Sequence, residues 1–169
     1  MIAIKKKFKN FGPLEALVFA AVFYVVVMLV WTAVTRKGVL EKANDIKSNH
    51  KNVVELLNKE INECSQNNQT KTSWGEDCNS TWTSSVIIEY ILKNVKLKNP
   101  YSLNKPLIIS STDPRIDAEG KAGQSTNKGI IFVTSDNFNV EVGSEWIVGT
   151  CIKSPCVAAG NNELVSVYR

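Results

Sequence analysis

The sequence predicts an α+β fold in which a long N-terminal helix, first transmembrane and then amphipathic, packs on a small antiparallel β-sheet. Three observations support this fold class. Residues 14–34 form an apolar run, residues 39–64 repeat apolar side chains every three or four positions, and residues 106–168 contain short β-branched segments separated by Gly, Asn, Ser and Pro. A length of 169 residues leaves room for one domain beside the apolar run and excludes a large multidomain enzyme.

The apolar run has the length of a membrane-spanning helix. At about 1.5 Å per residue, residues 14–34 span roughly 31 Å, close to the thickness of the hydrocarbon core of a bilayer. A secretory signal peptide has an apolar region of only about 7–15 residues and ends in a small-residue cleavage site. We therefore expect an anchor, since the alternative, a buried core helix, needs a larger surrounding protein than the remaining residues provide.

The charges around the run predict its direction. Lys5, Lys6, Lys7 and Lys9 precede it and account for the whole net charge of +4, so the residues after position 12 sum to zero. This excess of positive charge places the N-terminus in the cytoplasm and the remainder in the periplasm or outside the cell. The basic balance is therefore a topology signal, and no nucleic-acid partner is expected.

All four cysteines lie in the part predicted to be exported, where disulfides persist: Cys64, Cys78, Cys151 and Cys156. Three pairings are possible. Pairing 64 with 78 and 151 with 156 is the simplest, because it closes two short loops. A four-thiolate zinc site is disfavoured, since neither pair has the close spacing that such sites use. No cofactor is expected.

The first ten residues are expected to form a basic cytoplasmic leader (1–10), followed by the transmembrane helix (11–34) and an amphipathic helical stalk (35–64). The apolar stripe of the stalk would cover one face of the sheet. It consists of Val39, Ala43, Ile46, His50, Val53, Leu57, Ile61 and Cys64. His50 is interpreted as a packed or hydrogen-bonded helix residue, because the chain has no second histidine.

Residues 65–169 are predicted to form a disulfide-stabilised α+β head domain. A polar loop over 65–80 leads to a second helix that is capped by Asn79 or Ser80 and ended by Lys98–Tyr101. The predicted buried face of this helix consists of Trp82, Val86, Ile87, Tyr90 and Ile91. Short strands follow, and their close spacing favours antiparallel hairpins. The expected strands are 106–110, 129–134, 138–142, 146–151 and 164–168.

One loop carries three carboxylates that are candidate Ca²⁺ ligands: Asp113, Asp117 and Glu119. Their spacing lacks the D-x-[DN]-x-[DN]-G pattern of a calcium-binding loop, so a solvated polar connection is the preferred interpretation and no metal is expected. The sequence also lacks a phosphate-binding loop and the G-x-S-x-G and H-E-x-x-H motifs. No enzyme activity is therefore predicted.

A short basic leader, an apolar helix with glutamate near its start, an amphipathic continuation and a disulfide-closed sheet together resemble a type IV pilin or pilin-like (pseudopilin) subunit. Several shorter segments are also similar to those of pilin-like subunits, so the resemblance covers nearly the whole chain. These segments are Lys42–Lys51 with Val53–Val54 and Glu63–Cys64, Trp74–Cys78, Lys98–Tyr101 and the Cys151–Cys156 pair.

The resemblance implies that the leader is cleaved. Pilins are cut after a glycine that precedes Phe-Thr-Leu-Ile-Glu. Here Phe11 and Glu15 keep the first and fifth mature positions, and Asn10 stands where the glycine should be. The implied cut therefore lies between Asn10 and Phe11. The alternative cut, between Gly12 and Pro13, would place a proline first, which makes a poor peptidase substrate.

The function implied by the resemblance is that of a structural subunit of an extracellular filament, which polymerises through the hydrophobic helix. Its implied partners are other copies or related pilins, the prepilin peptidase, the pilus assembly machinery and the bacterial inner membrane. Glu15 would pair with the freed amine of a neighbouring Phe11, or would be a simple interfacial acid. Two other functions stay open: a type II secretion pseudopilin, and a non-polymerising signal-anchored periplasmic binding module.

Overall fold

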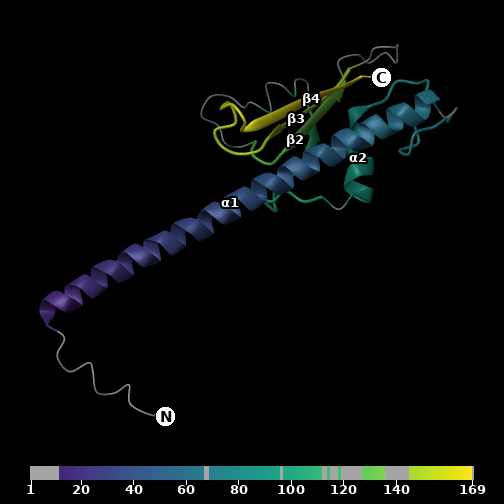
Figure 1. The fold of residues 1–169 in the computed structure, drawn as a ribbon. Helices are drawn as coiled ribbons and strands as arrows, with labels where there is room; N and C mark the ends of the chain where they lie inside the picture. The colour runs from purple at the N-terminus through teal and green to yellow at the C-terminus, as the bar shows by residue number, and fades with distance from the viewer. Residues whose placement is uncertain are drawn as a thin grey trace, which may run out of the picture. The chain divides into compact units, whose positions relative to one another are not determined.

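A computed structural model of the chain shows two helices and a four-stranded sheet (Figure 1). It describes residues 12–66, 69–95, 97–111, 114, 118, 127–135 and 145–168. By its internal contacts the chain divides into two compact units, residues 1–41 and 42–169. A long apolar N-terminal helix and a small sheet confirm the predicted α+β class.

Helix α1 runs without interruption from Pro13 to Gln66, as the apolar periodicity predicts. No proline follows Pro13 within it, and its single glycine, Gly38, costs only about 1 kcal/mol relative to alanine. Three lysine–glutamate pairs at a spacing of four residues each add a few tenths of a kcal/mol. They are Lys37–Glu41, Lys51–Glu55 and Lys59–Glu63, with Nζ–Oε1 distances of 3.9, 3.4 and 3.7 Å.

Within the second unit, α1 buries one stripe of side chains against the core. The buried residues are Ala43, Ile46, His50, Val53, Leu57, Glu60 and Ile61. The predicted stripe is therefore confirmed along its centre, whereas at its ends Val39 is 52% exposed and Cys64 is only half-buried. Burial of each large aliphatic side chain contributes about 1.5–3 kcal/mol, so this stripe is the main attachment of the helix to the sheet. The burial of Glu60 was not predicted.

The sheet has the strand order β1-β2-β3-β4. Its strands are β1 (Ile108–Ser110), β2 (Ile131–Ser135), β3 (Glu145–Cys151) and β4 (Asn162–Tyr168). These bounds match four of the predicted strands within two residues, and the fifth, 138–142, lies outside the described residues.

The prediction of a purely antiparallel sheet was wrong. Strands β2, β3 and β4 pair antiparallel, but β1 pairs parallel with β2, with Ile108 opposite Ile131. The connection between these two strands covers residues 111–130, which exceeds the dozen residues that a parallel crossover needs. The short spacing between the other predicted strands therefore did not indicate the direction of β1.

Helix α2 (Ser84–Asn94) is shorter at both ends than predicted. Its N-cap is Thr83, whereas Ser80 is held in a preceding turn, where its amide and hydroxyl both donate to the Asp77 carbonyl. The carboxylate of Glu76 accepts hydrogen bonds from the Thr83 amide and hydroxyl at 3.2 and 3.0 Å. The Glu76 side chain, seven residues earlier in the chain, therefore holds the start of α2, where the Thr83 side chain itself makes no capping hydrogen bond.

The predicted buried face of α2 is confirmed in part. Ile87 and Ile91 are buried, whereas Val86 and Tyr90 are half-buried and Trp82 is buried ahead of the helix. The last helical residue is Asn94, and the chain is already extended at Val95, so the helix does not reach the predicted stop at Lys98–Tyr101.

The main core lies between α1, α2 and one face of the sheet. It contains Trp146, Val148, Ile131 and Val133 of the sheet, together with the apolar residues of the α1 stripe and α2. A smaller cluster on the opposite face consists of Ala118, Ile130 and Phe132, with Ile109 packed against it. Strands β2 and β3 are therefore buried on both faces.

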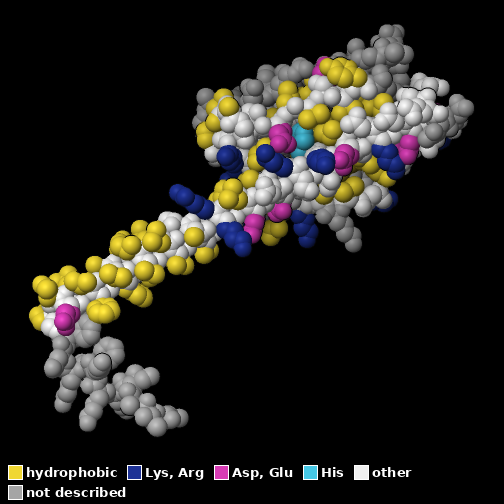
Figure 2. All heavy atoms as spheres, in the orientation of Figure 1, with side chains coloured by type: hydrophobic (Ala, Val, Ile, Leu, Met, Phe, Trp, Pro, Cys, Tyr) yellow, Lys and Arg dark blue, Asp and Glu magenta, His cyan; other side chains and the backbone are white. Residues whose placement is uncertain are grey.

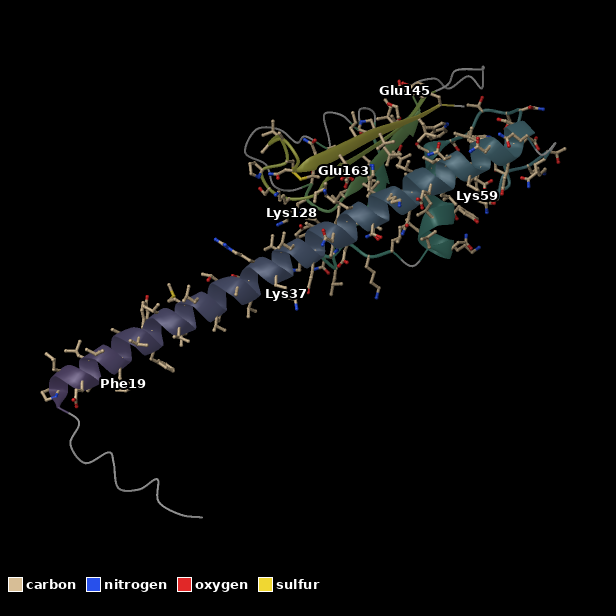
Figure 3. All side chains as sticks on the ribbon, in the orientation of Figure 1. Phe19, Lys37, Lys59, Lys128, Glu145 and Glu163 are labelled. Atoms are coloured by element: carbon tan, nitrogen blue, oxygen red, sulfur yellow. A yellow bond between two sulfur atoms is a disulfide. The ribbon has the colours of Figure 1, made fainter. Side chains whose placement is uncertain are left out.

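His50 is buried in this core beside the edge strand β4. It is 2% exposed, and neither ring nitrogen has a hydrogen-bond partner among the described residues. Lys47, one turn before it on α1, pairs with Glu163 at 3.4 Å. Figure 3 labels Glu163 on β4. Burial lowers the pKa of His50 below its ordinary value of 6.5, and the Glu163 carboxylate partly offsets this by raising it.

The lowered pKa of His50 predicts a loss of stability in mild acid. The folded state takes up this proton less readily than the unfolded state. The free energy of unfolding is therefore undiminished above about pH 6.5 and falls as the pH drops toward the pKa of His50 in the folded state. The total loss is about 1.4 kcal/mol for each unit by which the two pKa values differ. Urea unfolding of the full chain in detergent micelles, between about pH 7 and pH 5, measures this slope. His50→Leu should flatten it and Glu163→Gln should steepen it; equal slopes in all three proteins would contradict the assignment.

Two disulfides join Cys64 to Cys78 and Cys151 to Cys156, as predicted, and no described cysteine is free. The first ties the last turn of α1 to the following loop, and the second ties the end of β3 to the turn before β4. Their sequence separations are 14 and 5 residues.

The length of the loop that each disulfide closes predicts how much that disulfide contributes to the free energy of unfolding. Replacing both cysteines of the 64–78 pair with serine should lower the free energy of unfolding by about 3 kcal/mol, and the same change in the 151–156 pair by about 2 kcal/mol, because the longer loop constrains the unfolded chain more. Urea unfolding of the two double variants measures the difference. Peptide mapping of a non-reduced digest is the control, and a peptide linking Cys64 to Cys151 would refute the pairing.

Candidate functional site

The first half of α1 carries a continuous apolar surface. Every residue from Pro13 to Lys37 is exposed, and Figure 2 shows hydrophobic side chains covering this part of the helix, with charged side chains gathered over the second part. Leu14, Phe23 and Trp31 are 78%, 70% and 69% exposed. Soluble proteins rarely expose an apolar patch of this extent. By length and composition the helix is able to cross a membrane.

Glu15 caps the beginning of this helix. Gly12 is the N-cap, its carbonyl accepts the first helical hydrogen bond from the Ala16 amide at 3.1 Å, and Pro13 occupies the first helical position. The Glu15 carboxylate reaches back and accepts a hydrogen bond from the Gly12 amide at 3.2 Å. A glutamate at the third helical position that bonds the N-cap amide is one half of a capping box, and its charge also suits the positive end of the helix dipole.

Of the four residues that flank the two candidate cleavage positions, the structure describes two. Asn10 and Phe11, which flank the expected cut, lie outside the described residues. Gly12 and Pro13, which flank the alternative cut, form the junction between the N-cap and the helix. The capping interaction of Glu15 needs only Gly12, so a chain that begins at Phe11 retains it.

The acidic loop residues Asp113, Asp117 and Glu119 also lie outside the described residues. Within the described parts of the chain, no group of three or more His, Cys, Asp or Glu side chains is placed to hold a metal ion.

Glu60 docks the disulfide-closed loop onto α1. It is 1% exposed, and its carboxylate accepts hydrogen bonds from both the amide of Ser73, at 2.8 Å, and the hydroxyl of Ser73. The same loop places Trp74 edge-on to Trp82, with ring centroids 5.1 Å apart. Glu60 is not part of the apolar stripe that the sequence predicts, and its hydrogen bonds to Ser73 of the neighbouring loop explain why a carboxylate is buried there.

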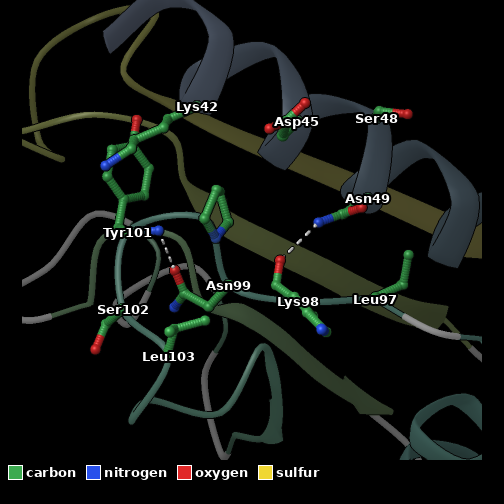
Figure 4. Close-up of a pocket in the computed structure, with 11 residues that line it drawn as sticks. Lys42, Asp45, Ser48, Asn49, Leu97, Lys98, Asn99, Tyr101, Ser102 and Leu103 are labelled. Carbon is green, nitrogen blue, oxygen red and sulfur yellow. Dashed lines mark hydrogen bonds between the residues drawn. The ribbon is translucent and has the colours of Figure 1, made fainter. Parts of the chain in front are cut away.

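A polar groove of about 590 Å³ lies between α1 and the segment 97–103 that follows α2. We call it the 42–103 groove. It is lined by Lys42, Asp45, Ser48 and Asn49 of α1 and by Leu97, Lys98, Asn99, Pro100, Tyr101, Ser102 and Leu103 (Figure 4). The amide of Asn49 donates to the Lys98 carbonyl at 3.4 Å and bridges the two walls.

Tyr101 is fixed by hydrogen bonds at the base of this groove. Its hydroxyl donates to the Ile152 carbonyl at 2.7 Å, and its amide donates to Oδ1 of Asn99 at 2.9 Å. Burial raises the pKa of Tyr101, so the hydroxyl stays protonated and can donate. Gly129, at a φ of +79°, allows the close packing behind it, because an added Cβ would lie 2.6 Å from Asn99 Oδ1 and 2.7 Å from the Tyr101 ring.

Two lysines lie near the Tyr101 ring. The ammonium groups of Lys42 and Lys128 lie 5.9 and 4.2 Å from its centroid. Lys42 and Lys98 line the groove itself. Among the described residues, none of these three lysines forms an ion pair with a carboxylate, and Asp45 is the one described acid that lines the groove. The groove therefore carries a local excess of positive charge.

One polar group of the groove lacks a partner. Asn99 is 4% exposed, and its Nδ2 donates to no acceptor in the part of the chain that the structure describes. An unpaired buried donor costs about 1–3 kcal/mol. In Figure 4 the Asn99 amide lies within the bend that the chain makes from Asn99 to Leu103. In the sequence, this Asn-Pro-Tyr segment served as a helix stop and as part of the resemblance to pilin-like subunits, and it did not show that Lys42 and Lys128 both lie near Tyr101.

The burial of Glu60 generates a stability prediction. Glu60→Ala leaves the Ser73 amide and hydroxyl without their acceptor and should lower the free energy of unfolding by about 1–3 kcal/mol. Glu60→Gln keeps one acceptor oxygen and should fall between wild type and alanine. Urea unfolding of the full chain in micelles measures both variants. Glu55→Ala, on an exposed position of the same helix, is the matched control and should cost less than about 0.5 kcal/mol; an equal loss there would rule out a special role for Glu60.

Comparison with known proteins assigns no identity to the chain. No family model, no curated protein and no solved structure matches it. Its function is therefore inferred from its residues and their geometry.

Proposed function

We propose that the chain is a structural subunit of a type IV pilus-like extracellular filament that polymerises through the first part of α1. The observation that carries this proposal is the exposed apolar surface of residues 14–34, which holds a single acid, Glu15, at its beginning. A surface of this kind needs an apolar environment, and both a bilayer and a bundle of like helices provide one.

Before assembly, the proposed environment is the bacterial inner membrane. The lysines at positions 5–9 keep the N-terminus in the cytoplasm, and the two disulfides of the second unit form after its export. In this state Glu15 lies close to the cytoplasmic edge and caps its own helix through the Gly12 amide. Charged groups cost less near the edge of the bilayer than at its centre.

During assembly, the proposal assigns Glu15 a second partner. Cleavage between Asn10 and Phe11 by a prepilin peptidase would free an α-amine on Phe11. Packing of apolar helices removes water from around Glu15, and an unpaired carboxylate there would be costly. The Phe11 amine of an adjacent subunit would supply a charge-assisted hydrogen bond. A carboxylate has two oxygens and several lone pairs, so the Gly12 cap and this bond are compatible.

A second candidate function is an anchored binding module that never polymerises. The 42–103 groove favours it, because a polar groove with an excess of positive charge is not required by a purely structural subunit. Both candidates use the same anchor, and they differ in whether Glu15 has a partner from another chain.

Substitutions at Glu15 test the filament proposal. Glu15→Ala should leave membrane insertion intact, since it removes a charge from the apolar segment, but should strongly reduce the amount of protein in filaments. Glu15→Gln retains the cap, because glutamine also completes a capping box, yet loses the charge, so it should give an intermediate yield. The measurement compares sheared surface fractions with membrane fractions for the three proteins.

The glutamine variant separates the two roles of Glu15. If only the helix cap matters, Glu15→Gln assembles like wild type. If Glu15 is merely an interfacial acid, all three proteins reach the surface equally, and the anchored binding module becomes the better explanation. Glu41→Gln is the matched control, because Glu41 is an exposed acid of the same helix and pairs only with Lys37 among the described residues.

A further inference from the structure

We propose that the 42–103 groove binds a ligand that carries one carboxylate beside several hydroxyl groups, as in an acidic sugar. The inference goes beyond filament assembly and does not depend on it, since the groove is built entirely within the second unit, residues 42–169.

The charge of the groove indicates an anion of low charge. Lys42 and Lys98 line it and contribute two ammonium groups that have no carboxylate partner among the described residues. Asp45, which lines the same groove, would repel a densely charged polyanion. A single carboxylate can pair with one of the two lysines and avoid Asp45.

The uncharged groups of the groove are suited to hydroxyl groups. Ser48 and Ser102 offer hydroxyls that both donate and accept, and the Asp45 carboxylate accepts from a sugar hydroxyl. Asn99 supports the bend behind these groups, because its Oδ1 accepts a hydrogen bond from the Tyr101 amide at 2.9 Å.

The groove is formed before any ligand arrives. The Asn49–Lys98, Tyr101–Ile152 and Tyr101–Asn99 hydrogen bonds hold its walls. Its volume of about 590 Å³ is within the range of small-molecule sites. We therefore expect selectivity by charge and hydroxyl pattern, with weak affinity.

Titration of the full chain in detergent micelles tests the site, with amide chemical shifts as the readout. Sodium D-glucuronate should shift the amides of residues 97–103 and saturate at millimolar concentrations, whereas D-glucose, which lacks the carboxylate, should not. Acetate, which lacks the hydroxyls, and inorganic phosphate, which carries more charge, should both bind more weakly than glucuronate. Equal responses to glucuronate and glucose, or a stronger response to phosphate or acetate, would overturn the proposal.

Lysine variants locate the binding. Lys42→Gln and Lys98→Gln should each weaken glucuronate binding by about fivefold, the factor for one solvent-screened charge pair at contact distance. Lys51→Gln removes a lysine from the same helix outside the groove and should leave the affinity unchanged. If Lys51→Gln weakens binding as much as Lys42→Gln, the interaction is non-specific attraction and the site is refuted. None of these exposed substitutions alters Glu15, so failure here leaves filament assembly unaffected.

Discussion

The arrangement of the second unit depends on the burial of one helical stripe. From Ala43 to Ile61, α1 supplies side chains to the core that also contains Trp146 and the apolar residues of α2. Without this stripe, the sheet would lose the cover on one face, the Glu60 carboxylate could not hold Ser73, and the wall of the groove that carries Lys42 and Asp45 would be missing. The same helix exposes apolar side chains over residues 14–34, so one continuous element carries an exposed apolar surface in its first part and a buried apolar stripe in its second.

Features encoded by local sequence were predictable. The course of α1 followed from a periodicity that local residues determine, and the disulfides from cysteines close in sequence. The direction of β1 was not predictable, because a pairing between Ile108 and Ile131 depends on a long connection that leaves no periodic signal. The start of α2 was missed for a similar reason: Glu76, seven residues before Thr83, replaces a local cap at Asn79 or Ser80.

The candidate sites show the same division. Glu15 was identified from its position in an apolar run. The sequence Gly12, Pro13, Glu15 is also typical of a helix N-terminus, which explains the hydrogen bond from the Gly12 amide to the Glu15 carboxylate. Glu60 and the groove were not identified, because each is assembled from segments far apart in the chain. Lys42 and Lys128 are distant in sequence and meet only because Tyr101 is bonded to Ile152 and packed against Gly129. No pattern within a single segment of the sequence predicts that these two lysines lie near the same ring.

The ion pair between Lys47 and Glu163 affects how readily the protein aggregates through its edge strand β4. Among the described residues β4 pairs only with β3, so its outer side offers backbone groups to which another strand can add. Glu163 near the start of that strand, bonded to a lysine of α1, would have to be desolvated by any incoming strand. A molecule that is concentrated by a membrane or by neighbouring copies meets others often, and a charge at this place discourages sheets from joining edge to edge.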